Sequence, residues 1–193
     1  MEDLVFRYQW ESYMKIPEST PEYALIGEGF TSLSESKNSK EYTRKYVHDK
    51  TERTDVIGYS PSIAYSCDKI SGDPVVNEVV KIHDDELVGS DARREIVSVN
   101  LWETAEGENT YRARKRTFAV IPSNKGDGTD ALIYTGTMKA CSDFVPGTFN
   151  RATKQFVPDT AASGNANSDS GNANSDSGNA NSDSGNSSGN GGN

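Results

Sequence analysis

The sequence has little of the material from which metal sites and reactive sites are built. Its 193 residues include only two cysteines and two histidines. Two cysteines are too few for a disulfide framework, so Cys67 and Cys141 are expected to be reduced, partly buried hydrophobic side chains. The pair His83-Asp84 would need further histidine and aspartate ligands to hold a metal ion, and the chain cannot supply them. We therefore expect no metal ion and no cofactor.

Long apolar runs and a basic surplus are also missing. No segment approaches the ~18 apolar residues of a membrane helix, and the acidic start Met1-Glu2-Asp3 is unlike a secretory signal, so we expect a cytoplasmic product without membrane insertion. The formal net charge is −9. Residues 161–193 hold three of the 29 acids and none of the 20 bases, which leaves 26 acids against 20 bases and a net charge of −6 elsewhere. This balance disfavours a protein that grips nucleic-acid phosphates.

Residues 161–193 lack every apolar side chain larger than alanine. The motif GNANSDS occurs there three times, and such a segment cannot bury enough surface to offset the entropy of ordering it. The sequence therefore predicts a folded domain of residues 1–160 and a disordered repeat tail of residues 161–193. Asn165, Asn167 and Asp169 alternate as calcium ligands do, but the glycine falls one place late and no bidentate Glu follows.

Most of the remaining sequence alternates between apolar and polar residues, with glycine and proline between the alternating runs. This period is typical of β-strands, which we expect in residues 4–14, 23–33, 41–47, 56–67, 94–103, 108–121 and 131–142, with shorter pieces at 144–150 and 154–158. One helix is expected, because Asp73 suits an N-cap, Pro74 suits the first helical position, and Gly89 could end it. The sum predicts a mainly β, antiparallel sandwich or barrel.

The sequence gives little support for a catalytic site. Acidic residues such as Glu28, Glu35, Asp84, Asp85 and Glu86 could form a carboxylate pair, but acids on the loops of an acidic protein are usually solvated. No G-x-S-x-G elbow accompanies the many serines. We do not expect an enzyme.

One charged pattern is unusual. Arg112, Arg114 and Arg116 fall on the same side of a single predicted strand. They form either a solvated face or a stripe that meets the acidic loops of a neighbouring subunit, since arginine pairs with carboxylates in a fork-like geometry. Both interpretations stay open at this stage.

The order and spacing of several segments over residues 1–160 resemble phage major tail tube proteins. The similarity is to tails of the long, non-contractile type in phages of Gram-positive bacteria. The segments that carry it are LVFRYQWESYMKI, YALIGEGFTSL, YVHDKTERTDVIGYSPSIAYS, DPVVNEVV and YTGTMKACSDFVPGTFN, the last of which ends in the recognisable Gly147-Thr148-Phe149-Asn150.

The resemblance implies an antiparallel β-sandwich of the tail-tube type with one flanking α-helix, an extended N-terminal arm, and a long inter-subunit loop at about Tyr46 to Tyr59. Six copies would form a ring, and rings would stack into a virion tail tube, assembled in the bacterial cytoplasm, through which DNA is ejected. The implied partners are other copies of the chain, a tape-measure protein and DNA in the lumen without specific binding, and other tail proteins at the tube ends.

On this reading the aromatic N-terminal strand lies at a subunit interface, although it could instead pack on its own sandwich. The expected interface residues are Phe6, Tyr8, Trp10, His48, Lys50, Arg53, Arg112, Arg114 and Arg116. Positions that face the lumen should average negative, because a conduit must not bind its cargo. A lumen lined by the three arginines of the stripe would contradict this expectation.

Two alternative functions fit a β-sandwich. The first is a secreted adhesin or pilus-like protein with a flexible Ser/Asn/Gly stalk, which the lack of a signal sequence disfavours. The second is a small β-sandwich hydrolase, which the lack of a nucleophile and base disfavours.

Overall fold

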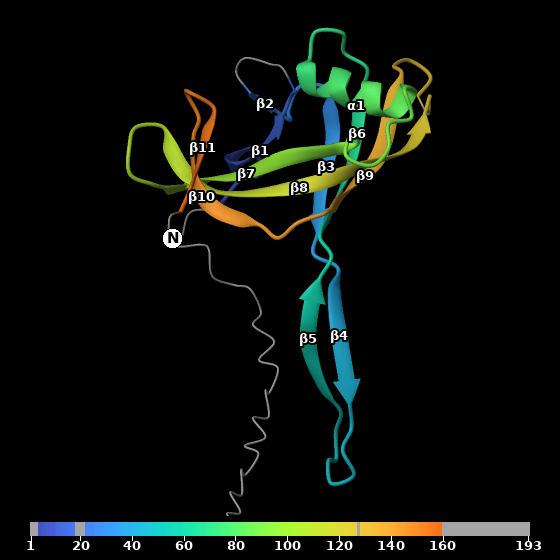
Figure 1. The fold of residues 1–193 in the computed structure, drawn as a ribbon, viewed down its shortest axis with the longest axis vertical. Helices are drawn as coiled ribbons and strands as arrows, with labels where there is room; N and C mark the ends of the chain where they lie inside the picture. The colour runs from blue at the N-terminus through green and yellow to red at the C-terminus, as the bar shows by residue number, and fades with distance from the viewer. Residues whose placement is uncertain (1–3, 18–21, 127, 160–193) are drawn as a thin grey trace, which may run out of the picture. The chain divides into compact units, whose positions relative to one another are not determined.

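The computed structural model describes residues 4–17, 22–126 and 128–159, and it is dominated by antiparallel strands (Figure 1). The predicted repeat tail, residues 161–193, lies outside the described residues. The strands are β1 (Trp10–Lys15), β2 (Tyr23–Leu25), β3 (Phe30–Ser36), β4 (Ser39–Arg44), β5 (Arg53–Tyr59), β6 (Ser62–Asp68), β7 (Arg93–Thr104), β8 (Thr110–Lys125), β9 (Ile133–Ala140), β10 (Val145–Asn150) and β11 (Gln155–Pro158). The described residues contain one α-helix, α1 (Pro74–Asp84), and a 3-10 turn, η1 (Arg7–Gln9), which precedes β1. The predicted mainly β, antiparallel fold with one flanking helix is confirmed.

Nine of the strands share one sheet, and β4 and β5 form a separate ribbon. The main path runs β2-β1-β7-β8-β9-β6-β3, and every pairing in it is antiparallel. The long strand β8 pairs with β7 on one side. On its other side it pairs with β10 along its first half and with β9 along its second half. Strand β8 therefore joins all parts of the sheet.

Two hydrophobic clusters lie on opposite faces of this sheet. Neighbouring residues of a strand point to opposite faces, and Met14 of β1 belongs to one cluster while Tyr13 belongs to the other. The same split separates Ile96 from Val97 in β7. The first cluster is completed by α1, which lies across one face (Figure 1), and the second by Phe149 of β10.

The helix forms where the sequence predicts it. The side chain of Asp73 accepts a hydrogen bond from the Val76 backbone N–H at 2.7 Å, and Pro74 occupies the first turn, where no amide donor is needed. Val75, Val76 and Val79 are fully buried on the sheet side. The helix ends at Asp84, well before the predicted stop at Gly89.

Replacing Asp73 by alanine should lower the free energy of unfolding by about 1 kcal/mol, because the Val76 N–H loses its cap. Urea unfolding followed by circular dichroism measures the change. Asp73→Asn keeps a side-chain acceptor and serves as the control, and it should retain most of the stability. Equal losses in the two variants would contradict the capping role.

The prediction of a strand over residues 4–14 is wrong for the N-terminal part of that range. Strand β1 begins only at Trp10, because residues 7–9 form a 3-10 turn in which the Gln9 N–H donates to the Phe6 carbonyl at 3.0 Å. The Gln9 side chain accepts a second bond from the Phe6 N–H at 2.7 Å. Phe6, Tyr8 and Trp10 therefore do not share one face of a strand, and the Phe6 and Tyr8 rings stack on each other in the exposed segment.

Half of the predicted inter-subunit loop from Tyr46 to Tyr59 is a strand. Strand β5 covers Arg53–Tyr59 and pairs with β4, with the Thr43 and Thr54 hydroxyls 3.0 Å apart across the pair. We call Ser39–Tyr59 the β4–β5 ribbon. It continues the β3–β6 pair beyond Ser60-Pro61, where the predicted strand 56–67 is interrupted, and extends away from the sheet (Figure 1).

A carboxylate network joins β7 to its neighbours. Glu95 accepts a hydrogen bond from the Tyr23 hydroxyl at 3.0 Å and lies 3.3 Å from the ammonium of Lys115 and 3.9 Å from that of Lys15. Partial burial acts to raise the pKa of Glu95, but these partners outweigh it and hold the pKa below the usual 4.5. The ionised carboxylate is therefore more stable in the folded protein than in the unfolded chain.

The contribution of Glu95 should disappear in acid. Because its folded-state pKa is lowered, its contribution to stability is fully present above pH 4.5 and is lost as the pH falls through the folded pKa. Glu95→Gln should therefore cost stability at about pH 6 and much less at about pH 3 in urea titrations. A difference between wild type and variant that stays constant over this range would contradict the account.

The two cysteines differ more than expected. Cys67 is fully buried in the first cluster, and burial raises the pKa of its thiol to about 11. Cys141 is exposed, which corrects the expectation that both are partly buried. The sequence shows both only as isolated cysteines in apolar strands, and the difference arises because Cys141 lies just beyond the end of β9.

Candidate interaction surface

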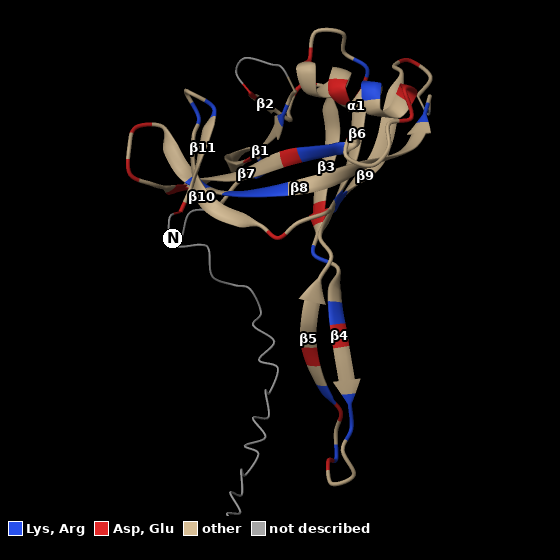
Figure 2. Ribbon diagram, viewed as in Figure 1, with Lys and Arg blue, Asp and Glu red and all other residues tan. Residues whose placement is uncertain are grey.

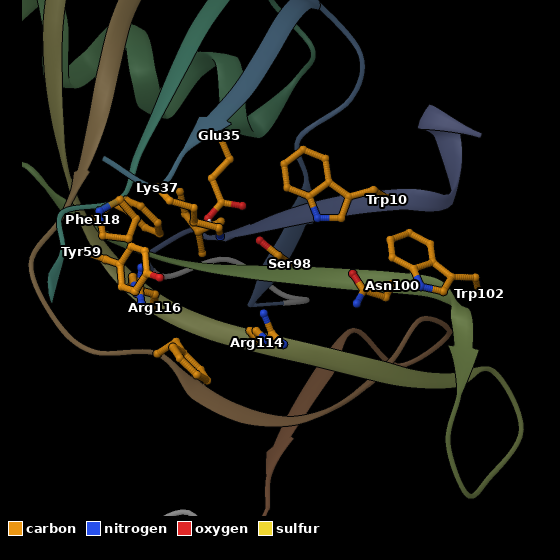
Figure 3. A pocket seen from close by; sticks show the side chains of 13 residues that line it. Trp10, Glu35, Lys37, Tyr59, Ser98, Asn100, Trp102, Arg114, Arg116 and Phe118 are labelled. Carbon is orange, nitrogen blue, oxygen red and sulfur yellow. The ribbon is translucent and has the colours of Figure 1, made fainter. Parts of the chain in front are cut away.

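A groove opens on the same face of the sheet as the helix-covered core. Its volume is about 440 Å³, and its floor is formed by β7 and β8 (Figure 3). Strand register explains the floor, because Ser98 pairs with Arg114 and Ile96 pairs with Arg116, and paired residues point to one face. We call this the Trp–Arg groove. Its floor residues are Ile96, Ser98, Asn100, Trp102, Arg114, Arg116 and Phe118.

Three other parts of the chain form the walls of the groove. Trp10 at the start of β1 contributes one wall, and Phe144, in the connection between β9 and β10, contributes a second. The base of the β4–β5 ribbon contributes the third through Tyr59 and the neighbouring Lys37 and Glu35 (Figure 3). The chain has only two tryptophans, and both line this groove.

The groove is positively charged within an acidic protein. Among its lining residues Lys37, Arg114 and Arg116 oppose a single carboxylate, Glu35, which pairs with Lys37. Neither arginine forms an ion pair with any of the described carboxylates, and the buried Nε of Arg116 has no hydrogen-bond acceptor there. Both guanidinium groups instead lie over the Phe144 ring, at 5.3 and 5.6 Å from its centre. The groove therefore offers two guanidinium groups that can donate hydrogen bonds to a carboxylate.

The arginine stripe lies on β8 as predicted, and the basic residues are visible along that strand in Figure 2. The third member behaves differently from the other two. Arg112 Nη1 donates to both carboxylate oxygens of Asp159, at 3.1 and 3.0 Å, so its charge is satisfied within the chain. Only Arg114 and Arg116 line the groove.

The N-terminal segment, residues 4–9, directly precedes the groove residue Trp10 in the sequence and is highly exposed. Leu4 and Tyr8 are 75% and 71% exposed, and Val5 and Phe6 are about half exposed. Arg7 fixes the base of the segment, because its Nη1 donates to the Trp10 carbonyl at 2.8 Å and its guanidinium lies 4.7 Å from the centre of the Trp10 ring. The segment therefore ends next to Trp10, in a wall of the groove, while its own apolar side chains are exposed to solvent.

The β4–β5 ribbon presents a second exposed apolar surface. None of its residues belongs to either hydrophobic cluster of the described chain. Its exposed large side chains are Tyr42, Tyr46, Val47, Val56, Ile57 and Tyr59. Edges of paired strands with such side chains usually meet a partner, because they would otherwise promote aggregation.

The tip of the ribbon is ordered by Asp49. Its carboxylate is 2.8 Å from Arg53 Nη2 and 3.3 Å from His48 Nε2, and its N–H donates to the Tyr46 carbonyl at 3.0 Å. The Tyr46 ring stacks on His48 and also faces the Arg53 guanidinium. A tip held in this way can present the same side chains to each partner.

The predicted interface residues therefore fall into separate groups. Trp10, Arg114 and Arg116 meet in the Trp–Arg groove. His48, Lys50 and Arg53 lie at the ribbon tip, Phe6 and Tyr8 lie in the N-terminal segment, and Arg112 is paired with Asp159. Sequence reasoning missed Trp102 and Phe144 as groove residues. The alternation in residues 94–103 put Trp102 on the same side as Ser98, but nothing in it showed that this side faces Arg114.

The described residues contain no group of three or more His, Cys, Asp or Glu side chains placed to hold a metal ion. Within the same residues no helix has the length and apolar character needed to cross a membrane.

No protein family model matches this chain, and no curated protein matches it. Among solved structures, a chain of the six-fold symmetrised baseplate of the anti-feeding prophage is similar, with 12% identity and a TM-score of 0.47 over 76% of this chain and 97% of that chain. A chain of the tube-terminating cap of the anti-feeding prophage has 11% identity and a TM-score of 0.48 over 77% and 93%. A chain of the PVC sheath-tube complex, an extracellular contractile injection system in its extended state, has 13% identity and a TM-score of 0.43 over 76% and 93%. Because all three TM-scores lie below 0.5, these likenesses do not define the function of this chain.

Proposed function

We propose that the protein is the structural subunit of a phage-tail tube. Six copies form a ring, and stacked rings form the hollow conduit through which DNA passes into the host cell. The tail is of the long, non-contractile type implied by the sequence resemblance. The tape-measure protein and DNA occupy the lumen without specific binding, and other tail proteins bind the ends of the tube.

The observation that carries this proposal is the β4–β5 ribbon. An isolated two-stranded ribbon is at best marginally stable in water. This one exposes aromatic and β-branched side chains along both strands, from Tyr42 to Tyr59, and no described core residue covers them. Packing against a second copy would bury these side chains and stabilise the ribbon.

The positions of the exposed apolar surfaces and of the unpaired arginines support a head-to-tail assembly that closes into a ring. The ribbon, the N-terminal segment and the Trp–Arg groove are different surfaces, so a copy that uses one of them against another surface of its neighbour makes a heterologous contact. Such contacts give closed rings when the rotation between copies closes, and open helical filaments when it does not. A role as a building block also requires no catalytic group.

Negative-stain electron microscopy of the purified full-length protein tests the proposal. We expect hollow rings and tubes of uniform diameter. Separate small particles at every concentration, including after addition of tail initiator complexes, would contradict it, as would pili-like solid fibres, which favour the adhesin alternative.

A further inference from the structure

We propose that the Trp–Arg groove binds the N-terminal segment of a second copy of this chain, with Glu2 and Asp3 of that copy facing Arg114 and Arg116. This inference deepens the proposed function, because it names one of the contacts that join subunits.

The groove needs an acidic occupant. Arg114 and Arg116 have no carboxylate partner among the described residues, and the buried Nε of Arg116 lacks an acceptor. A buried guanidinium N–H without a partner is costly, and a carboxylate is its strongest acceptor. The protein carries a surplus of acids, so a second copy is an available source of carboxylates.

The groove also needs an occupant with large apolar side chains. Trp102 on the floor and Phe144 in a wall remain 41% and 48% exposed, and together with Trp10 they give the groove large aromatic surfaces. Aromatic surfaces of this kind favour aromatic and aliphatic side chains, and arginine and tryptophan are common among residues that dominate binding energy.

The first eight residues have the matching composition. Glu2 and Asp3 are followed by Leu4, Val5, Phe6 and Tyr8, so two acids adjoin four large apolar side chains. Residues 4–8 are exposed, so these described residues do not fill the groove of their own chain.

Other acidic segments fit less well. Asp84, the last residue of α1, is already engaged with Lys125 at 2.9 Å, and the connection that follows the helix exposes only one large apolar side chain, Val88. Glu103 lies near the end of β7, and Glu106 and Glu108 lie in the β7–β8 connection, but this part of the chain exposes no aliphatic side chain.

Binding of this segment has a structural consequence for the tube. A groove filled by a neighbouring copy places Arg114 and Arg116 within a subunit contact. The positive charges of the stripe are then neutralised there and do not face the cargo, in line with the expectation that lumen positions average negative.

Intrinsic fluorescence tests the inference directly, since both tryptophans of the chain line the groove. The full-length protein, at a concentration where it is monomeric, is titrated with the synthetic peptide Met-Glu-Asp-Leu-Val-Phe-Arg-Tyr, which contains no tryptophan. We expect a saturable change in tryptophan emission. The peptide with Glu2→Lys and Asp3→Lys should bind about tenfold more weakly or not at all, because it loses both charge-assisted contacts.

Protein variants complete the test. Arg114→Glu/Arg116→Glu should abolish peptide binding, and the peptide with lysine at positions 2 and 3 should then bind this variant instead. The control Arg93→Glu/Lys139→Glu makes the same change in net charge at two exposed positions outside the groove and should bind the original peptide as wild type does. An emission change that survives in the groove variant, or that no peptide produces, would overturn the inference. So would an emission change caused by single-stranded DNA and not by the peptide.

Failure of this inference and failure of the proposed function give different results. Tubes that still form from the Arg114→Glu/Arg116→Glu variant, without peptide binding by wild type, refute the groove contact and leave the tube function standing. Specific peptide binding without rings or tubes refutes the tube function and leaves the groove contact standing.

Discussion

A variant in which Asn-Gly replaces residues 41–57 should keep its fold and lose its ability to assemble. Lys40 and Gly58 are paired neighbours in the register of the β4–β5 ribbon, so a two-residue turn can join them without disturbing β3 or β6. No ribbon residue belongs to a hydrophobic cluster, and we expect the free energy of unfolding to change by about 0.5 kcal/mol or less. Assembly should be lost because the removed strands carry the exposed apolar surface.

Sedimentation and electron microscopy of the ribbon variant measure assembly, and urea unfolding measures its stability. Deletion of residues 161–193 provides the matched control, because it removes a longer segment that has no apolar side chain larger than alanine. That control should form tubes as wild type does. Tube formation by the ribbon variant, or its loss in the tail deletion, would contradict our assignment of the assembly surface.

The second large effect concerns the ion pair between Glu78 of α1 and Arg94 of β7. The two residues are only 9% and 8% exposed, and Arg94 Nε donates to the Glu78 carboxylate at 2.8 Å. A second guanidinium nitrogen of Arg94 contacts the same oxygen, and Nη1 donates to the Asp91 carbonyl at 2.8 Å. This pair joins the helix to the sheet at the edge of the first hydrophobic cluster.

Glu78→Ala should lower the free energy of unfolding by about 3 to 5 kcal/mol, because it leaves a buried guanidinium without its carboxylate. This is a large part of the roughly 5 to 15 kcal/mol that stabilises an ordinary domain. Urea unfolding at neutral pH measures the loss.

The double variant Glu78→Leu/Arg94→Met separates the cost of an unpaired charge from the loss of packing. Replacing a buried pair by apolar side chains of similar volume is often neutral, so the double variant should recover most of the stability that Glu78→Ala loses. A single variant that costs less than about 1 kcal/mol would contradict the burial of this pair.

Local sequence signals predicted the elements well where local interactions decide the structure. The alternation in residues 94–103 and 108–121 predicted β7 and β8, and the pair Asp73-Pro74 predicted the start of α1. The strand predicted over residues 56–67 is divided at Ser60-Pro61 into the end of β5 and most of β6.

Where competing local contacts decide the structure, the same signals failed. The pattern of residues 4–9 is that of a strand, but hydrogen bonds between Phe6 and Gln9 form a 3-10 turn instead. The polar stretch before Val56 suggested a loop, yet Arg53 and Thr54 pair with Arg44 and Thr43 of β4, a contact that the local sequence does not show.

The groove could be predicted only in part. The arginine stripe was visible in the sequence, whereas its surroundings depend on pairings between distant residues. Ser98 meets Arg114 through strand register, and Phe144 approaches both arginines from the connection between β9 and β10. No periodicity within one strand contains this information.

The most direct test of the account is the mass of the full-length protein in solution as a function of concentration, measured by sedimentation velocity. If other copies cover the ribbon and fill the groove, the 21.0 kDa monomer should give way, as concentration rises, to large discrete species. A protein that remains a 21.0 kDa particle at every concentration, also in the presence of tail initiator complexes, would contradict the claim that these surfaces are completed by further copies of the chain.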